Sequence, residues 1–83
     1  MVEKVKLYAL STCGHCRQLK EFLDSHQVPY ESIDVDRLPQ HERKAVMREV
    51  RKLNPIGSFP TSVVGDKTIV GFREAQLREA LGL

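Results

Sequence analysis

Long runs of apolar residues are missing from this sequence. No stretch approaches the roughly 20 consecutive apolar residues that a membrane-spanning helix needs. The first six residues also lack the charged-then-apolar pattern of a secretory signal. We therefore expect a cytoplasmic protein with no membrane partner.

An excess of one charge sign is missing as well. Thirteen Lys and Arg residues stand against eleven Asp and Glu residues, for a formal net charge of +2. Within 42–52 the basic residues alternate with Glu42 and Glu49, which is typical of a solvated helix face. The basic residues of this run include Lys44, Arg48, Arg51 and Lys52. This pattern argues against nucleic acid as a partner, and we expect none.

Cysteine is scarce, and both copies, Cys13 and Cys16, lie in one Thr-Cys-Gly-His-Cys stretch. A disulfide across so short a loop constrains the unfolded chain little. Two thiols do not complete a four-coordinate zinc site, and the sequence has no second CxxC. In a reducing cytoplasm the pair is better explained by chemistry than by structure. That chemistry is either thiol–disulfide exchange or the binding of a soft metal.

Length limits the fold to one small domain, residues 1–83. A chain of this size buries roughly 60–65% of its unfolded surface, which leaves no room for a large enclosed cofactor. We find no repeat, linker or low-complexity segment. We therefore expect a monomer with no bound cofactor.

Hydrophobic periodicity predicts seven elements. The expected strands cover about 4–10, 30–35, 61–64 and 68–70, and the expected helices cover about 14–26, 39–53 and 73–81. Ser11 and Thr12 can cap the first helix, and Pro39 stands where a first helical residue would go. The predicted buried helix positions are Cys16, Leu19, Phe22, Leu23, Val46, Val50, Leu53, Ala75, Leu77, Ala80 and Leu81.

The order β-α-β-α-β-β-α specifies an α/β fold. A right-handed crossover makes the first two strands parallel, and the turn at 65–67 makes the last two an antiparallel hairpin. The result is a four-stranded mixed sheet with helices on both faces.

Three separated motifs give this chain a family resemblance. They are Cys13-Gly14-His15-Cys16 after the first strand, Phe59-Pro60-Thr61 opening the hairpin, and Val70-Gly71-Phe72-Arg73 before the last helix. In this order they resemble the glutaredoxins and, more broadly, the thioredoxin superfamily. The resemblance implies the thioredoxin (glutaredoxin-like) fold and a dithiol oxidoreductase that reduces protein disulfides.

The resemblance also implies a substrate-binding surface. Its members would be Thr12, Phe59, Pro60, Thr61, Gly71, Phe72 and Arg73. Pro60 would carry a cis peptide bond and face the cysteines. That geometry would let the Phe59 backbone pair with an extended substrate segment. The alternative is a proline that merely begins an edge strand. Phe59 and Phe72 either rim the site or pack in the core, and Thr12 either hydrogen-bonds near Cys13 or caps the helix.

Two departures bear on the electron donor. Glutathione-using glutaredoxins usually have Lys or Arg where this chain has Leu10, and an acid where it has Arg73. An arginine repels the glutathione ammonium. The Gly71-Phe72-Arg73 run is similar to the NrdH-redoxins, which implies a thioredoxin-reductase-type flavoenzyme as donor and ribonucleotide reductase as one candidate substrate. Glutathione remains the other candidate reductant.

Catalytic roles can be assigned within the cysteine motif. Cys13 lies at the mouth of a helix, where amide donors and the helix dipole favour a thiolate, so we predict that it is the nucleophile. Cys16, one turn further and more buried, is the predicted resolving thiol. His15 either stabilises the thiolate or is an exposed polar residue. Cys-Gly-His-Cys also occurs in protein disulfide isomerases, with potentials near −180 mV against about −270 mV for thioredoxin, so we expect a comparatively oxidising pair.

Two metal-binding hypotheses compete with exchange. The Ser11–Cys16 stretch is similar to the Cu(I) loop of copper chaperones, although Ser11 stands where their methionine would be. An iron–sulfur cluster shared across a dimer is the second possibility. The predicted last helix and the second cysteine favour exchange, so we predict no metal site.

Overall fold

The computed structural model describes residues 4–83 and confirms the predicted order of elements. The strands are β1 (Val5–Ala9), β2 (Tyr30–Asp34), β3 (Thr61–Val64) and β4 (Lys67–Val70). The helices are α1 (Gly14–Ser25), the short 3-10 helix η1 (Val35–Arg37), α2 (Gln40–Leu53) and α3 (Glu74–Leu81). Periodicity does not predict η1, because three residues are too few to show a helical period. Pro39 is the N-cap of α2, one position before the predicted place.

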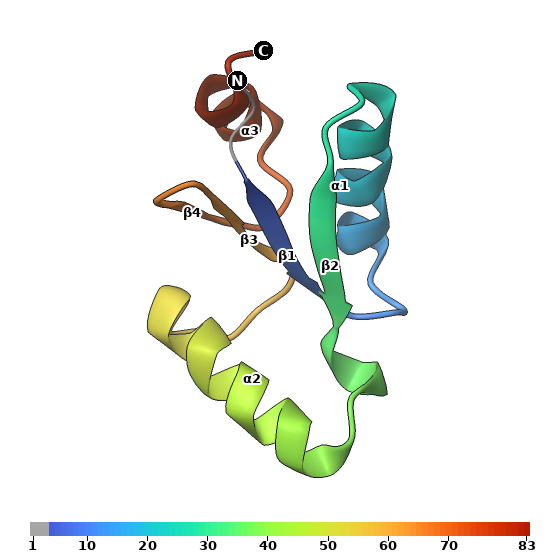
Figure 1. Cartoon of the computed structure of the whole chain (residues 1–83), viewed down its shortest axis with the longest axis vertical. Helices are drawn as coiled ribbons and strands as arrows, with labels where there is room; N and C mark the ends of the chain where they lie inside the picture. Colours follow the sequence, from blue (N-terminus) through green and yellow to red (C-terminus); the bar gives the residue numbers. More distant parts are fainter. Residues whose placement is uncertain (1–3) are drawn as a thin grey trace.

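The four strands form one mixed sheet in the order β2-β1-β3-β4 (Figure 1). β1 runs parallel to β2 and antiparallel to β3, and β3 pairs antiparallel with β4. Val64 pairs with Lys67, so the hairpin turn consists of Gly65 and Asp66 and is one residue shorter than predicted. Gly65 has a φ of 62°, a left-handed conformation that favours glycine.

Two hydrophobic clusters cover opposite faces of the sheet, as the α/β prediction requires. The larger one joins α1 and α3 to the sheet through Val5, Leu7, Ala9, Cys16, Leu19, Phe22, Leu23, Val28, Val64, Ile69 and Leu77. The smaller one lies beneath α2 and has Tyr8, Val35 and Val50 as its buried members. Since Leu7 and Tyr8 alternate between the two clusters, β1 is buried on both faces. In Figure 1, α2 crosses one end of the sheet, away from α1 and α3.

Two predicted core positions are wrong. Leu53 is 37% exposed, because α2 contacts the smaller cluster only through Val46, Met47 and Val50, and Leu53 ends the helix beyond it. Ala75 is exposed because it lies two residues, or about 200° of helical rotation, from the buried Leu77. Within residues 4–83, no helix has both the length and the apolar character needed to cross a bilayer.

Candidate active site

The first turn of α1 is built around Cys13. Cys13 is the N-cap of α1, with extended backbone angles, and its Sγ accepts a hydrogen bond from the Cys16 amide at 3.2 Å. The predicted capping role of Ser11 and Thr12 is therefore wrong. The sulfur of Cys13 takes the position that an oxygen takes in an ordinary N-cap. The predicted nucleophile therefore accepts the hydrogen bond of a backbone amide that has no partner within the helix.

The two thiols have different environments. Both are free, but Cys13 is partly exposed while Cys16 is 1% exposed and belongs to the larger cluster. Burial, followed by the hydrogen bond with Cys13, raises the pKa of Cys16 from 9.0 to about 12. At neutral pH Cys16 is therefore a protonated thiol, and it lies behind the more exposed Cys13. This difference agrees with the predicted roles, in which Cys13 reacts first and Cys16 resolves.

Two carboxylates at and just after the end of β2 fix the loop before Cys13 and the helix that follows it. Asp36 Oδ1 accepts from the Ser11 amide at 2.8 Å, and Asp36 Oδ2 accepts from Ser11 Oγ at 2.5 Å. These hydrogen bonds lower the pKa of Asp36. Nearly two turns into α1, Lys20 Nζ lies 3.3 Å from Asp34 Oδ1. The loop and the helix are thus both tied to the end of β2.

The cis Phe59–Pro60 bond opens β3, as the resemblance implied. The carbonyl of Pro60 accepts a hydrogen bond from the Gly71 amide at 2.8 Å, which joins the second and third motifs directly. Gly71 has a φ of 82°, so glycine is favoured where the chain turns back toward Pro60.

Asn54 supports the Pro60 turn from inside. It is 3% exposed, and its Nδ2 lies within hydrogen-bond distance of Ser58 O, Ser58 Oγ and Thr61 Oγ1. Its Oδ1 accepts from the Ile56 amide at 3.2 Å. Asn54 therefore organises the segment between α2 and β3 that positions the cis proline.

Two shallow depressions flank the cysteines. The first, of about 270 Å³, is lined by His15, Phe59, Pro60, Val70, Gly71, Phe72 and Arg73. The second, of about 120 Å³, is lined by Ser11, Thr12, Cys13, Gly14 and Arg17. Neither lining includes a carboxylate, and each includes an arginine. The nearby Glu74 faces Arg78, 3.5 Å from its Nε.

The glutaredoxin family model matches residues 5–69, which include the cysteine pair and the cis proline. The chain belongs to the glutaredoxin family. Family and relatives together make it a thiol–disulfide redox protein.

Solved structures and relatives agree with that membership. Methanoredoxin from Methanosarcina acetivorans is 43% identical with a TM-score of 0.92, over 98% of this chain and 86% of that one. A glutaredoxin from Archaeoglobus fulgidus is 41% identical with a TM-score of 0.87, over 96% and 86%. The glutaredoxin-like protein NrdH of Lactococcus lactis is 25% identical over 88% of this chain and 93% of its own length.

The fold of this glutaredoxin brings most of the predicted site residues together. His15, Phe59, Pro60, Gly71, Phe72 and Arg73 line one depression, and Thr12 and Cys13 line the other. Phe59 and Phe72 were predicted either to rim the site or to pack in the core. They do both, since they line the depression and also pack on the larger cluster. His15 is exposed, with Nδ1 3.3 Å from Gln18 Oε1.

Thr61 lies behind the site rather than on it. Its side chain is fully buried and donates to Ser58 O at 2.8 Å, so its hydroxyl does not face a substrate. Three further residues at or behind the site were not predicted from the sequence, namely Asp36, Asn54 and Arg17. Asp36 had a usable signal, because parallel neighbouring strands end at the same edge and β1 leads into Cys13. Asn54 had no such signal in the sequence, because its hydrogen-bond partners are brought together only by the folded turn between α2 and β3.

Across residues 4–83, no three His, Cys, Asp or Glu side chains gather as a metal-ligand set would.

Proposed function

We propose that this glutaredoxin reduces disulfides in proteins through the Cys13–Cys16 pair. The observation that carries the proposal is the geometry of the first turn of α1. The sulfur of the partly exposed Cys13 accepts a hydrogen bond, at 3.2 Å, from the backbone amide of Cys16, whose own thiol is buried one turn further along. Such an arrangement suits attack on an outside disulfide followed by intramolecular resolution.

The reaction proceeds in two exchanges. The Cys13 thiolate attacks one sulfur of the substrate disulfide, forming a mixed disulfide and releasing the other substrate sulfur as a thiolate. Cys16 then gives up its proton and attacks Cys13 Sγ, which forms the Cys13–Cys16 disulfide and releases the second substrate thiolate. Two electrons pass to the substrate, and a separate donor returns two electrons to the cysteine pair.

The donor we propose is a thioredoxin-reductase-type flavoenzyme, with glutathione as the alternative. Arg73 supplies a cation where the γ-glutamyl ammonium of glutathione would lie, and no carboxylate lines that depression. Leu10 is half-buried against the smaller cluster and offers no charge to a glutathione carboxylate. A like charge beside the ammonium disfavours binding.

A turnover assay tests both parts of the proposal. NADPH oxidation is followed with a protein disulfide as substrate, once with thioredoxin reductase and once with glutathione plus its reductase. We expect faster turnover with thioredoxin reductase. Faster turnover with glutathione reverses the choice of donor, while stoichiometric Cu(I) binding without turnover from either donor contradicts the oxidoreductase itself.

A further inference from the structure

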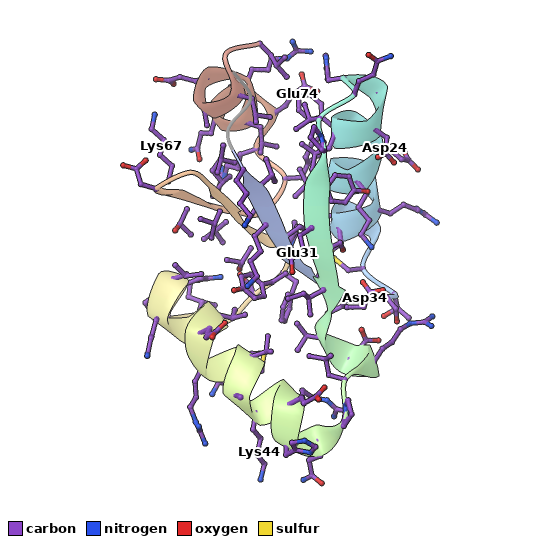
Figure 2. All side chains as sticks on the ribbon, in the orientation of Figure 1. Asp24, Glu31, Asp34, Lys44, Lys67 and Glu74 are labelled. Carbon is purple, nitrogen blue, oxygen red and sulfur yellow. The ribbon has the colours of Figure 1, made fainter. Side chains whose placement is uncertain are left out.

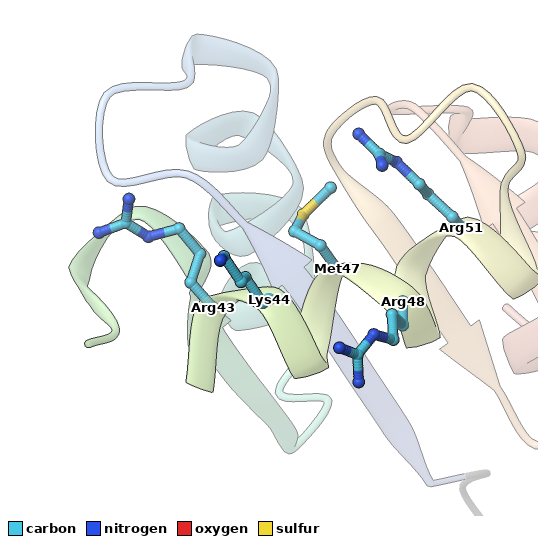
Figure 3. Close-up of a pocket in the computed structure, with 5 residues that line it drawn as sticks. All are labelled: Arg43, Lys44, Met47, Arg48 and Arg51. Atoms are coloured by element: carbon cyan, nitrogen blue, oxygen red, sulfur yellow. The ribbon is translucent and has the colours of Figure 1, made fainter. Parts of the chain in front are cut away.

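Another depression, of about 390 Å³, lies along α2, and the active site does not use it. Its lining residues are Arg43, Lys44, Met47, Arg48 and Arg51, which we call the α2 groove. Figure 3 shows Arg43, Met47 and Arg51 extending from the same side of the helix, with Arg48 on another side. The five positions span two turns, or about 12 Å of helix.

The cations of this groove have no acidic partner within residues 4–83. The ion pairs of that part of the chain are Lys20–Asp34 and Glu74–Arg78. Glu49, on the same helix, accepts instead from the Tyr8 hydroxyl at 3.3 Å. The positive charge of the α2 groove is therefore available to an outside anion.

The groove adjoins the active site through the smaller cluster. Met47 packs in that cluster together with Leu10, three residues before Cys13, and with Phe59, the residue before the cis proline. At the other end, a Cβ on Gly57 would lie 3.2 Å from Arg51 Nε and 3.7 Å from Met47 Cε, so the Asn54–Gly57 turn closes the groove. Ile56, on that turn, is 84% exposed.

These features fit a protein surface better than a small ligand or a nucleic acid. All four cations are exposed and line an open depression, so no buried polar group defines a small-molecule site. The groove contains no aromatic side chain on which a base could stack. Arginine and methionine, which line the groove, are residue types enriched in protein interfaces.

We propose that the α2 groove docks an acidic segment of the disulfide-containing target protein, which holds its disulfide near Cys13. This inference rests on the proposed function and adds a substrate preference to it. Because the contacts involve exposed charges, they should act mainly on encounter with the target and weaken as salt rises.

The test uses three synthetic peptides with the same internal disulfide, each joined by a flexible spacer to an acidic, neutral or basic tail. The test variant is Lys44→Glu/Arg48→Glu. The control variant is Lys52→Glu/Lys67→Glu, which makes the same change in net charge outside the groove. Figure 2 shows Lys44 on α2 and Lys67 at the β3–β4 hairpin, well apart.

At low salt we expect the wild-type protein to reduce the acidic peptide about tenfold faster, in kcat/KM, than the basic peptide. The groove variant should lose about tenfold on the acidic peptide and nothing on the neutral one, whereas the control variant keeps the preference. Raising the salt to about 0.5 M should reduce the wild-type preference toward the variant level.

Three results would overturn the docking surface. They are equal losses in both variants, no preference for the acidic tail in the wild-type protein, and stronger competition by an oligothymidylate than by an acidic peptide of equal charge. The last result would assign the groove to nucleic acid. In all three the neutral peptide is still reduced, whereas failure of the wild-type protein on every peptide contradicts the proposed function instead.

Discussion

Replacing Asn54 with alanine should destabilise this protein more than any single surface change. The amide is 3% exposed and contacts three acceptors through Nδ2 and one donor through Oδ1. Its two amide hydrogens can make only two full hydrogen bonds, so the side chain contributes three in total. At about 1 kcal/mol net for each, Asn54→Ala should lower the free energy of unfolding by about 3 kcal/mol.

Urea denaturation and thermal melting of the reduced protein measure this loss. For a domain of this size, about 3 kcal/mol corresponds to a fall in Tm of roughly 12–24 °C. Ser25→Ala is the matched control, because exposed Ser25 makes one side-chain hydrogen bond, to Phe22 O at 2.8 Å. It should cost about 1 kcal/mol or less.

Thr61→Val keeps the experiment informative when the alanine variant folds poorly. It has nearly the same shape and removes only the hydroxyl that joins Asn54 to Ser58, so an intermediate loss of about 1–2 kcal/mol is expected. A loss below about 1 kcal/mol for Asn54→Ala would contradict a stabilising role for these hydrogen bonds, because it would mean that water replaces them freely.

Three further predictions concern the cysteine motif. Cys13→Ser should abolish exchange, whereas Cys16→Ser should trap a mixed disulfide with the target, detectable by mass spectrometry; the opposite pattern would reverse the assigned roles. The free energy of unfolding of the reduced protein should fall as pH rises from 9.0 to about 12, because in that interval the unfolded chain has lost the Cys16 proton and the folded chain retains it. Cys16→Ala should show a smaller fall between the same pH values, and an unchanged curve would mean that Cys16 does not cause it. The potential of the pair, equilibrated against glutathione buffers, should lie above the roughly −270 mV of thioredoxin, and His15→Ala should lower it. A wild-type value at or below thioredoxin's contradicts the oxidising prediction.

Local pattern was sufficient for the elements and their order. Both kinds of periodicity involve residues no more than a few positions apart. They are the period-2 alternation of Val5–Ala9 and the helical spacing of Cys16, Leu19, Phe22 and Leu23. The structure confirms the strand and the helix within one or two residues. The parallel pairing of β1 with β2 also followed, because a strand–helix–strand unit has one common handedness. Pattern failed at Leu53, where α2 ends beyond the smaller cluster, and at Ala75, which lies on the other side of α3 from the buried Leu77.

Two thiols at the start of a helix after a buried strand are visible in the amino-acid sequence, and that pattern is enough to predict exchange chemistry. How the two thiols differ depends on the folded chain. The hydrogen bonds between Asp36 and Ser11 join residues that are 25 positions apart in the sequence. The burial of Cys16 likewise depends on strands and helices that are distant along the chain. Desolvation depends on distance in space, so the raised pKa of Cys16 and the place of the α2 groove beside the active site follow from packing. The hydrogen bond from the Cys16 amide to Cys13 Sγ is, by contrast, local to the start of α1.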